Sequence, residues 1–281
     1  MVVGALGPSQ APLFFSVLDQ HVQVQCQDAE TCALLSVNHE LTHEPSPAVA
    51  LEYVVGKREA SSAFFIQRSG QPALTAADEG EFLFLFEEDL SLAYQRLRAD
   101  LYFLHAASLE LNGKACLLVA PSGGGKSTTT WALLHHGFGY GGDELSPVDL
   151  QKMAVHSYPQ ALCLKQEPPA SYPLPSGVLR TPHRLYVPTA LLPAGVSRGL
   201  LPLTAIFFLH YSPRAAAPAV EPLSKAEAGV RLFANALNAL AHPGEGLDGA
   251  IEIAERTTCL RLMSADLVET CLLVQATLAR L

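Results

Sequence analysis

The sequence predicts an α/β fold in which a small β-rich unit precedes a larger unit of alternating strands and helices. Three observations support this prediction. Residues 1–88 contain alternating apolar and polar runs separated by turn clusters. From residue 105 onward, short apolar runs alternate with helical patterns. The run at 115–120 leads directly into a glycine-rich loop and a helix, as in a βαβ unit. We therefore expect two domains, an N-terminal domain with its connecting helix over 1–98 and a second domain over 99–281.

The N-terminal elements follow from hydrophobic periodicity. Residues 17–26 alternate apolar and polar side chains, which predicts a half-buried strand. Further strands are expected over 51–55, 63–67 and 81–86. A helical stripe predicts the connecting helix over 89–104. His39 and His43 are four residues apart, but no third ligand accompanies them, so a solvated loop is favoured over a metal site.

The C-terminal elements have clearer boundaries. Residues 203–209 form an apolar run typical of a buried strand. Ser224 begins a capping-box sequence, and the helix that follows is expected to stop at the His-Pro-Gly sequence 242–244. Ser264 is expected to cap the last helix. The proline-rich segment 166–184 predicts a loop that covers a site or holds a substrate.

The composition excludes several classes of protein. Charged residues make up 16% of the chain, against about 25% in an average domain, and apolar residues make up 49%, so a disordered chain is excluded. The net charge, 18 − 27 = −9, argues against a nucleic-acid partner. No apolar run reaches the length of about 20 residues that a membrane span needs. The N-terminus does not resemble a signal peptide, and the six cysteines lack zinc spacing, so we expect a cytoplasmic protein with reduced thiols.

The glycine-rich loop carries the strongest chemical signal. Residues 120–127 read Ala-Pro-Ser-Gly-Gly-Gly-Lys-Ser, between a buried strand and a helix. Glycines let backbone N–H groups converge on phosphate oxygens, and the helix N-terminus adds partial positive charge. A lysine here reaches the β- and γ-phosphates of a nucleotide, and a serine hydroxyl ligates Mg²⁺. The residues expected to bind the nucleotide are Ser122, Gly123, Gly124, Gly125, Lys126, Ser127 and Thr128.

One position departs from the usual phosphate-loop pattern. The pattern begins with glycine, whereas this chain has Ala120. Alanine fits this turn only if its φ angle is negative. A glycine-rich turn that binds nothing is the alternative. The strand, lysine, serine and helix in the expected order favour phosphate binding.

An acidic pair follows the glycine-rich loop at a sequence spacing that is expected to place it beside that loop in the fold. A helix from Lys126 would end at Gly137, and a short strand would then return parallel to the first one. Asp143 and Glu144 end that strand, at the sheet edge where ligands bind. Phosphoryl transfer needs one acid to hold Mg²⁺ and one to accept a hydroxyl proton. Because side chains alternate along a strand, we expect only one of the pair to face the metal directly. A solvated acidic turn is the alternative.

Together these residues resemble a known family. The His-Ala-Ala sequence 105–107, the sequence GGGKST, the helix end at Gly137 and the pair Asp143-Glu144 resemble the core of HPr kinase/phosphorylase and HPr-kinase-related proteins. These proteins have a phosphoenolpyruvate-carboxykinase-like P-loop fold. The likeness is good over 101–145, weaker to about 240, and absent from the first 88 residues. Two further segments resemble the HPr-kinase-related group, Tyr158–Lys165 and Pro222–Ala228.

The resemblance implies a serine kinase that uses ATP and Mg²⁺, with His105, Asp143 and Glu144 at its catalytic centre. Asp143 would accept the proton, although the division of roles within the acid pair stays open. Bifunctional members place Glu directly after the loop serine, whereas this chain has Thr128. The downstream loop needed for phosphorolysis is also not found, so the resemblance implies a kinase without phosphorylase activity. Some relatives phosphorylate lasso-peptide precursors, and family members are often oligomers, so a peptide or protein substrate and a homo-oligomer are expected.

Further cations are expected near the transferred phosphoryl group. Lys165 has the best position in the resemblance and is the preferred candidate. Arg180, Arg184 and Arg231 are weaker candidates, for which structural roles are favoured. His135, His136 and Trp131 are expected to be structural. The alternatives to a peptide or protein kinase are a small-molecule kinase, such as one acting on free serine, a nucleotide-binding regulator without phosphotransfer, and a simple NTP hydrolase.

Overall fold

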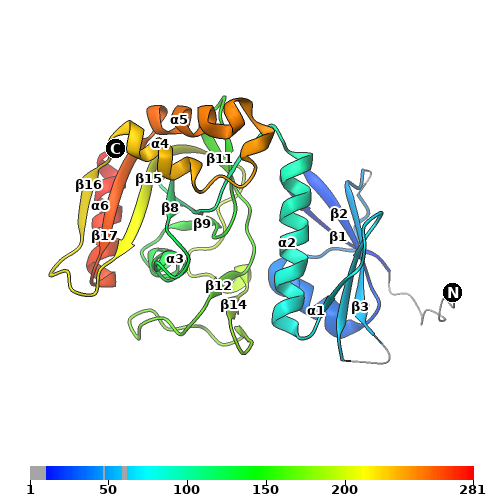
Figure 1. Ribbon diagram of the computed structural model, residues 1–281. Helices are drawn as coiled ribbons and strands as arrows, with labels where there is room; N and C mark the ends of the chain where they lie inside the picture. The colour runs from blue at the N-terminus through cyan, green and yellow to red at the C-terminus, as the bar shows by residue number, and fades with distance from the viewer. Residues whose placement is uncertain (1–10, 47, 59–61) are drawn as a thin grey trace.

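The computed structural model describes residues 11–46, 48–58 and 62–281 as a mixed α/β protein. Two main sheets lie on either side of the long helix α2 (Glu79–Leu97), as Figure 1 shows. The mixed α/β class agrees with the sequence prediction. The division into domains at residue 98 stays a prediction.

The N-terminal sheet has five strands in sequence order. Its strands β2 and β3 are parallel and joined through helix α1 (Ala29–Asn38), and its other neighbours are antiparallel. The strands are β1 (Leu13–Val17), β2 (Gln20–Cys26), β3 (Leu51–Lys57), β4 (Phe64–Arg68) and β5 (Leu74–Ala76). The single strand expected over 17–26 is wrong. Leu18 and Asp19 have φ angles of 52° and 60° and turn the chain between β1 and β2, as a two-residue hairpin requires.

Helix α2 corrects two expectations. Residues 81–86 were expected as a strand, but they belong to α2. The Asp78 side chain accepts a hydrogen bond from the Glu81 N–H and caps the helix at its start. The buried positions Phe82, Phe86 and Leu90 follow a four-residue spacing, not an alternation. The helix expected over 89–104 also ends earlier, because strand β6 (Tyr102–Leu104) follows it.

The second sheet leads into the glycine-rich loop at the end of β8 and has helices on both faces. Its strand order is β6-β10-β11-β15-β8-β7-β9, and β17 pairs with β15 and β16. The remaining strands of this sheet are β7 (Ala107–Leu111), β8 (Lys114–Val119), β9 (Gly139–Gly142), β10 (Ser146–Asp149), β11 (Ala154–His156), β15 (Leu200–Tyr211), β16 (Ala219–Pro222) and β17 (Thr258–Ser264). Side chains alternate along β8, so that Cys116 and Leu118 pack on one face and Leu117 and Val119 on the other.

The helices cover these two faces of the sheet. Helices α3 and α6 pack on the face that holds Leu118, and α4 and α5 pack on the opposite face. The helices are α3 (Lys126–His135), α4 (Lys225–Phe233), α5 (Leu247–Arg256) and α6 (Leu267–Arg280). The remaining elements of the described residues are a separate three-stranded sheet and three short 3-10 helices. They are β12 (Leu162–Leu164), β13 (Leu179–Arg180), β14 (Leu185–Val187), η1 (Thr189–Leu191), η2 (Ala239–Ala241) and η3 (Pro243–Gly246).

The unit expected around the loop is present, with one strand inserted. Strands β8 and β9 both pair antiparallel with β7, so they run parallel to each other with β7 between them. The strand expected over 203–209 lies within β15, which pairs parallel with β8. The expected helix stop at Gly137 is confirmed, because this residue has a left-handed φ of +86°.

Two helix boundaries near the C-terminus differ from expectation. Ser224 caps α4 as predicted, because its Oγ accepts from the Glu227 N–H at 3.2 Å. However, α4 ends at Phe233 and does not run on to residue 242. The last helix is capped by Asp266, whose side chain accepts from the Glu269 N–H, while Ser264 ends strand β17.

Buried apolar residues of α2 connect the core of the N-terminal sheet with residues of the second unit. Apolar residues of the N-terminal sheet and α2 form one cluster with Leu101, Phe103, Leu145 and Tyr158, which lie outside that sheet. Within the described ranges, no helix is both long and apolar enough to cross a membrane.

Candidate active site

The glycine-rich loop joins β8 to α3, and each of its glycines has a steric reason. Gly123 and Gly125 have φ angles of +80° and +89°, which other residues rarely adopt. A Cβ on Gly124 would lie 2.9 Å from the carbonyl oxygen of Pro121. Ala120 is not among the residues with positive φ, so alanine fits at this position without strain. The loop thus leaves the first N–H groups of α3 open to an anion.

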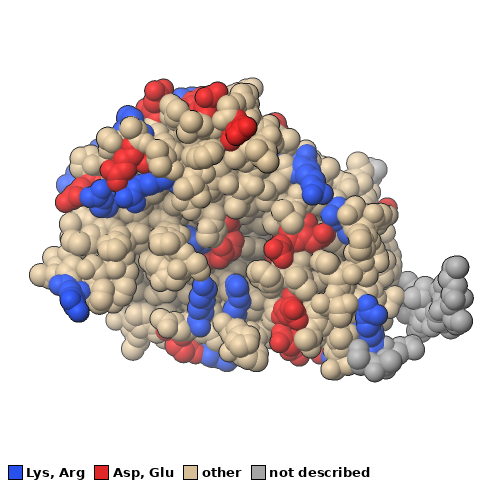
Figure 2. Space-filling view, in the orientation of Figure 1, with Lys and Arg blue, Asp and Glu red and all other residues tan. Residues whose placement is uncertain are grey.

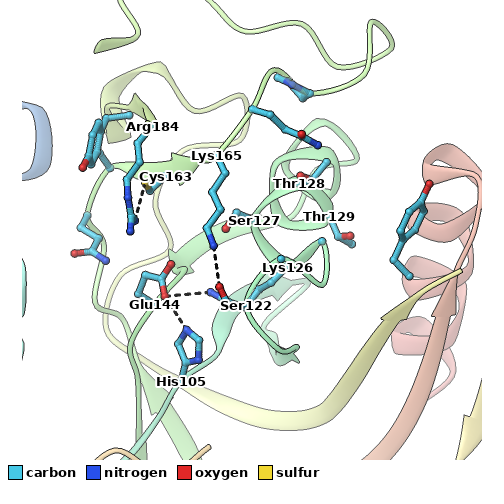
Figure 3. Close-up of a pocket in the computed structure, with 18 of the residues that line it drawn as sticks. His105, Ser122, Lys126, Ser127, Thr128, Thr129, Glu144, Cys163, Lys165 and Arg184 are labelled. Atoms are coloured by element: carbon cyan, nitrogen blue, oxygen red, sulfur yellow. Dashed lines mark hydrogen bonds and ion pairs between the residues drawn. The ribbon is translucent and has the colours of Figure 1, made fainter. Parts of the chain in front are cut away.

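Lys126 connects this loop to the acidic pair. Its side chain is buried, and its Nζ donates to the main-chain oxygen of Asp143. The same Nζ lies 3.2 Å from Asp143 Oδ1 and 3.6 Å from Glu144 Oε2. Figure 3 shows Lys126 and Glu144 pointing toward each other below the start of α3. The return of the chain through β9 therefore brings the predicted lysine and both predicted carboxylates together.

Asp143 lies behind Lys126, away from solvent. Its side chain is 1% exposed, and its Oδ2 has no hydrogen-bond partner within the described part of the chain. Burial raises the pKa of this carboxyl group above its usual range, although the neighbouring charge of Lys126 acts in the opposite direction. Asp143 is not among the residues that line the pocket described below.

Glu144 lies on the open side of Lys126 and is partly exposed. Its Oε2 lies 2.8 Å from His105 Nε2, in a bend between β6 and β7 (Figure 3). Burial alone would raise the pKa of Glu144, but the hydrogen bond with His105 and the charge of Lys126 lower it to about 2. The two carboxylates thus face different surroundings. Both lie in a bend after β9 and not in the strand that was expected to end with them. His105 precedes β7, which begins at Ala107.

Of the four candidate cations, Lys165 and Arg184 line the pocket described below, whereas Arg180 and Arg231 do not. Lys165 lies just after β12 and donates from Nζ to Ser122 Oγ at 2.8 Å, across the glycine-rich loop (Figure 3). Arg184 lies near the same pocket, with Nη1 3.5 Å from Cys163 Sγ. Arg180 is exposed and pairs with Glu167. Arg231 pairs with Glu227 on α4 and does not line the pocket.

A pocket of about 940 Å³ opens beside these residues. One wall contains the glycine-rich loop, Glu144 and Lys165, and the opposite wall is part of α2. Figure 2 shows the hollow, with acidic side chains on the α2 side and basic side chains opposite. The pocket-lining residues of α2 are Leu83, Phe84, Glu87, Glu88 and Ser91. The sequence reasoning missed this wall, because residues 81–86 were assigned to a strand.

The proline-rich segment forms part of the pocket rim. Its residues 166–169, Ser171 and Tyr172 line the pocket. The Trp131 indole of α3 donates to the main-chain oxygen of Tyr172 at 2.9 Å, and His136 Nε2 lies 2.7 Å from the Tyr172 hydroxyl. Trp131 and His136 thus have the structural roles expected for them, and they hold the segment next to the loop.

The donor set fits a magnesium ion. Ser127, Asp143 and Glu144 offer hydroxyl and carboxylate oxygens, which Mg²⁺ prefers, and Asp143 Oδ2 is a buried oxygen that lacks a partner among the described residues. No group of three or more His, Cys, Asp or Glu residues that could hold a metal occurs in the described ranges. A site with few protein ligands is usual where phosphate oxygens and water complete the shell of Mg²⁺.

Comparison with known proteins adds little beyond this geometry. No family model matches the chain, and no curated protein sequence matches it. Among solved structures, the chain is distantly similar to the Hpr(Ser) kinase/phosphatase from Coxiella burnetii, at 13% identity and a TM-score of 0.31. The match covers 63% of this chain and 93% of that chain. So distant a likeness supports no conclusion about function. The functional argument therefore rests on the residues of the site.

Proposed function

We propose that this chain is an ATP- and Mg²⁺-dependent kinase that transfers the γ-phosphate to a serine or similar hydroxyl of a peptide or protein. One observation carries the proposal: Lys126, at the start of α3, contacts both Asp143 and Glu144 at the edge of a large pocket. A phosphate-binding loop with an acidic pair within reach of its lysine is the arrangement that phosphoryl transfer needs.

The nucleotide would lie over the glycine-rich loop. The N–H groups of residues 122–127 and the Lys126 ammonium would hold its phosphates, with Thr128 as a further donor. Lys165 and Arg184 face the same pocket and would balance charge on the transferred group. Ser127 and one acid of the pair, Asp143 or Glu144, would hold Mg²⁺, which neutralises charge on the phosphates when it is bound.

The two carboxylates would have different roles. In the transfer, the acceptor oxygen bonds to the γ-phosphorus, and the bond from that phosphorus to the β–γ bridging oxygen breaks. The acceptor proton moves to Asp143, whose buried carboxyl group Lys126 would uncover as its ammonium turns from Asp143 to the bound phosphates. A general base works best when its pKa lies near the operating pH, and burial raises the pKa of Asp143 in that direction. Glu144, with a pKa of about 2, stays ionised and is a weak base. Its hydrogen bond with His105 would keep its carboxylate in place.

Three further features belong to the proposal. Thr128 follows Ser127 where the bifunctional kinases that the sequence resembles have Glu, which supports a kinase without phosphorylase activity. A homo-oligomeric state is proposed on the same resemblance. A cytoplasmic location is proposed on the six cysteines, which lack zinc spacing and are free thiols. The acidic pair in contact with Lys126 favours a transferase over a nucleotide-binding regulator.

The test is label transfer from γ-labelled ATP in the presence of Mg²⁺. Acceptors would be free serine, a generic serine peptide and peptides encoded beside the gene, with wild type and Lys126→Ala run together. We expect label on an acceptor with the wild type and not with the variant. Bound nucleotide without transfer to any acceptor, or label released only as inorganic phosphate, would contradict the kinase proposal.

A further inference from the structure

The α2 side of the pocket contains polar atoms that lack hydrogen-bond partners. Asn38 Oδ1, Glu87 Oε2 and the Tyr158 hydroxyl are buried, and none has a partner within residues 11–46, 48–58 and 62–281. Asn38 and Tyr158 are 4% and 2% exposed, and all three residues line the pocket that contains Lys126. They come from the end of α1, from α2, and from the segment between β11 and β12.

Neighbouring segments hold these three residues in place at the pocket. Glu87 Oε1 accepts from Asn38 Nδ2 at 3.1 Å and lies 2.6 Å from His39 Nε2. One carboxylate oxygen of Glu87 thus has hydrogen-bond partners, while the other, Oε2, has none among the described residues. The His39 ring, expected in a solvated loop, is instead buried and stacks on Phe15 at 4.1 Å. The Tyr158 N–H donates to the Gly141 oxygen at 2.7 Å, two residues before Asp143. A hydrogen bond therefore joins Asn38 to Glu87, and Tyr158 is tied to β9 just before the acidic pair.

The chemistry of the cluster indicates what would bind there. A carboxylate oxygen and an amide oxygen can only accept hydrogen bonds, so both need a donor. The exposed carboxylate of Glu88 also lines the pocket on the same helix. Lys126 and Lys165 line the opposite wall of the pocket, beside the loop expected to hold phosphate. A group with several N–H donors and a positive charge matches the α2 wall.

We propose that Asn38, Glu87, Glu88 and Tyr158 bind a cationic nitrogen group of the acceptor substrate, an ammonium or a guanidinium, while its hydroxyl group faces the acidic pair. This inference rests on the proposed function, and it narrows the acceptor to a cationic one. Two sources carry this chemistry, a small amino alcohol and a serine peptide flanked by lysine or arginine.

The experiment compares acceptors that differ only in charge. Full-length protein with Mg²⁺ and γ-labelled ATP is given ethanolamine or ethylene glycol as the small pair. The peptides AKAKSKAKA, AQAQSQAQA and AEAESEAEA form the second set. We expect kcat/KM for one cationic member to exceed that of its neutral partner at least tenfold, and the responding set identifies the source. A neutral or acidic acceptor that reacts equally well or better would overturn the inference and leave the proposed kinase intact.

Variants connect the preference to the wall. Glu87→Gln should lower kcat/KM for the cationic acceptor about tenfold, with the KM for ATP and the rate on a neutral acceptor changed less than twofold. Glu87 also contacts Asn38 of α1, so its replacement could disturb the fold. Glu88→Lys therefore tests the exposed position, where we expect the preference among acceptors to shift toward AEAESEAEA. Glu255→Gln, an exposed acid on α5 outside the pocket, is the matched control and should change nothing. Unchanged preference in both wall variants would overturn the inference.

A binding measurement separates this inference from the kinase proposal. Fluorescently labelled AKAKSKAKA and AQAQSQAQA, and ethanolamine as a competitor, are titrated into the protein with Mg²⁺ and ADP. Charge-selective binding that Glu88→Lys abolishes, without label transfer to any acceptor, would support the cationic site and contradict the kinase. Label transfer without any charge-selective binding would support the kinase and contradict the cationic site.

Discussion

Lys126 is the residue at which the local sequence and the long-range fold meet. Its position in the glycine-rich loop is set within eight residues, but its partners Asp143 and Glu144 are reached only after a helix and a strand. A buried ammonium beside two carboxylates is stabilised by them, and each carboxylate responds differently to its own surroundings. The residue-scale predictions therefore concern these charges.

Lys126→Ala should abolish phosphoryl transfer and weaken ATP binding. The variant removes the only charge that contacts both Asp143 and Glu144 in the described structure, and it removes the expected contact with the phosphates. Loss of transition-state charge stabilisation is expected to cost at least ~100-fold in kcat. Label transfer and nucleotide titration measure the two effects. Lys152→Ala, on an exposed lysine paired with Asp149, is the control and should keep wild-type activity.

Asp143→Asn should slow transfer while nucleotide binding stays near the wild-type level. Asparagine keeps the shape of the side chain but cannot take the acceptor proton, and loss of a general base costs roughly 10²–10⁴-fold in rate. Single-turnover transfer and ATP titration separate the two effects. A wild-type transfer rate in this variant would show that Asp143 is not the base.

The pH dependence of stability should report the pairing of Glu144. The pKa of this group is about 2 in the folded protein, below its ordinary 4.5. The pairing therefore stabilises the folded state fully above pH 4.5, and this contribution is lost as the pH falls toward 2. Without nucleotide or metal, wild type should melt above Glu144→Gln at pH 6, and the difference should shrink between pH 4.5 and 3. A difference that grows on acidification would contradict this pairing.

At the scale of elements, α2 has two roles on two faces. One face packs Phe82, Phe86 and Leu90 into the core, and the other presents Phe84 and Glu88 to the pocket. A helix was not expected at its start because several apolar residues are adjacent, EFLFLF, which obscures the difference between periods of 2 and 3.6. The cap at Asp78 and packing on β4 and β5 stabilise the helical conformation of this segment.

The two faces of α2 should respond differently to mutation. Phe86 is fully buried against Tyr53, with ring centroids 4.9 Å apart, so Phe86→Ala should cost about 3–5 kcal/mol of unfolding free energy. Phe84 is 45% exposed, and Phe84→Ala should change stability by less than ~1 kcal/mol. Denaturant unfolding of the two variants provides the measurement. Equal losses would show that α2 does not pack as described.

At the scale of the whole molecule, the continuous core makes the two sheets interdependent. The apolar cluster that begins in the N-terminal sheet includes Leu145, which follows the acidic pair, and Tyr158, whose hydroxyl belongs to the polar side of the pocket. The pocket itself takes its walls from both parts of the chain. The N-terminal unit therefore contributes to the site directly.

This shared core predicts cooperative unfolding. Calorimetry should show a single transition, because separating the two parts would expose a large apolar surface. Phe86→Ala should move the whole transition to lower temperature. Two transitions, with only one moved by Phe86→Ala, would instead support independent domains that meet at residue 98.

Much of the second unit could be predicted from local patterns. The strand before the loop, the stop at Gly137 and the cap at Ser224 each depend on neighbouring residues and occur as expected. The hairpin turn at Leu18, the helical start of α2 and the burial of His39 were not predicted. The burial of His39 depends on contacts with Phe15 and Glu87, which are distant in the sequence. The turn and the helix start have local causes, which alternating or adjacent apolar residues obscured.

The sequence by itself determined the glycine-rich loop, the lysine and the acidic pair, because residue types at fixed spacing restrict backbone conformation and chemistry locally. Only the tertiary structure decided that Asp143 is buried and Glu144 paired with His105. It also decided that α2 forms the opposite wall of the pocket. Burial and the meeting of charges depend on which distant segments pack together, and that packing shifts the two pKa values in opposite directions.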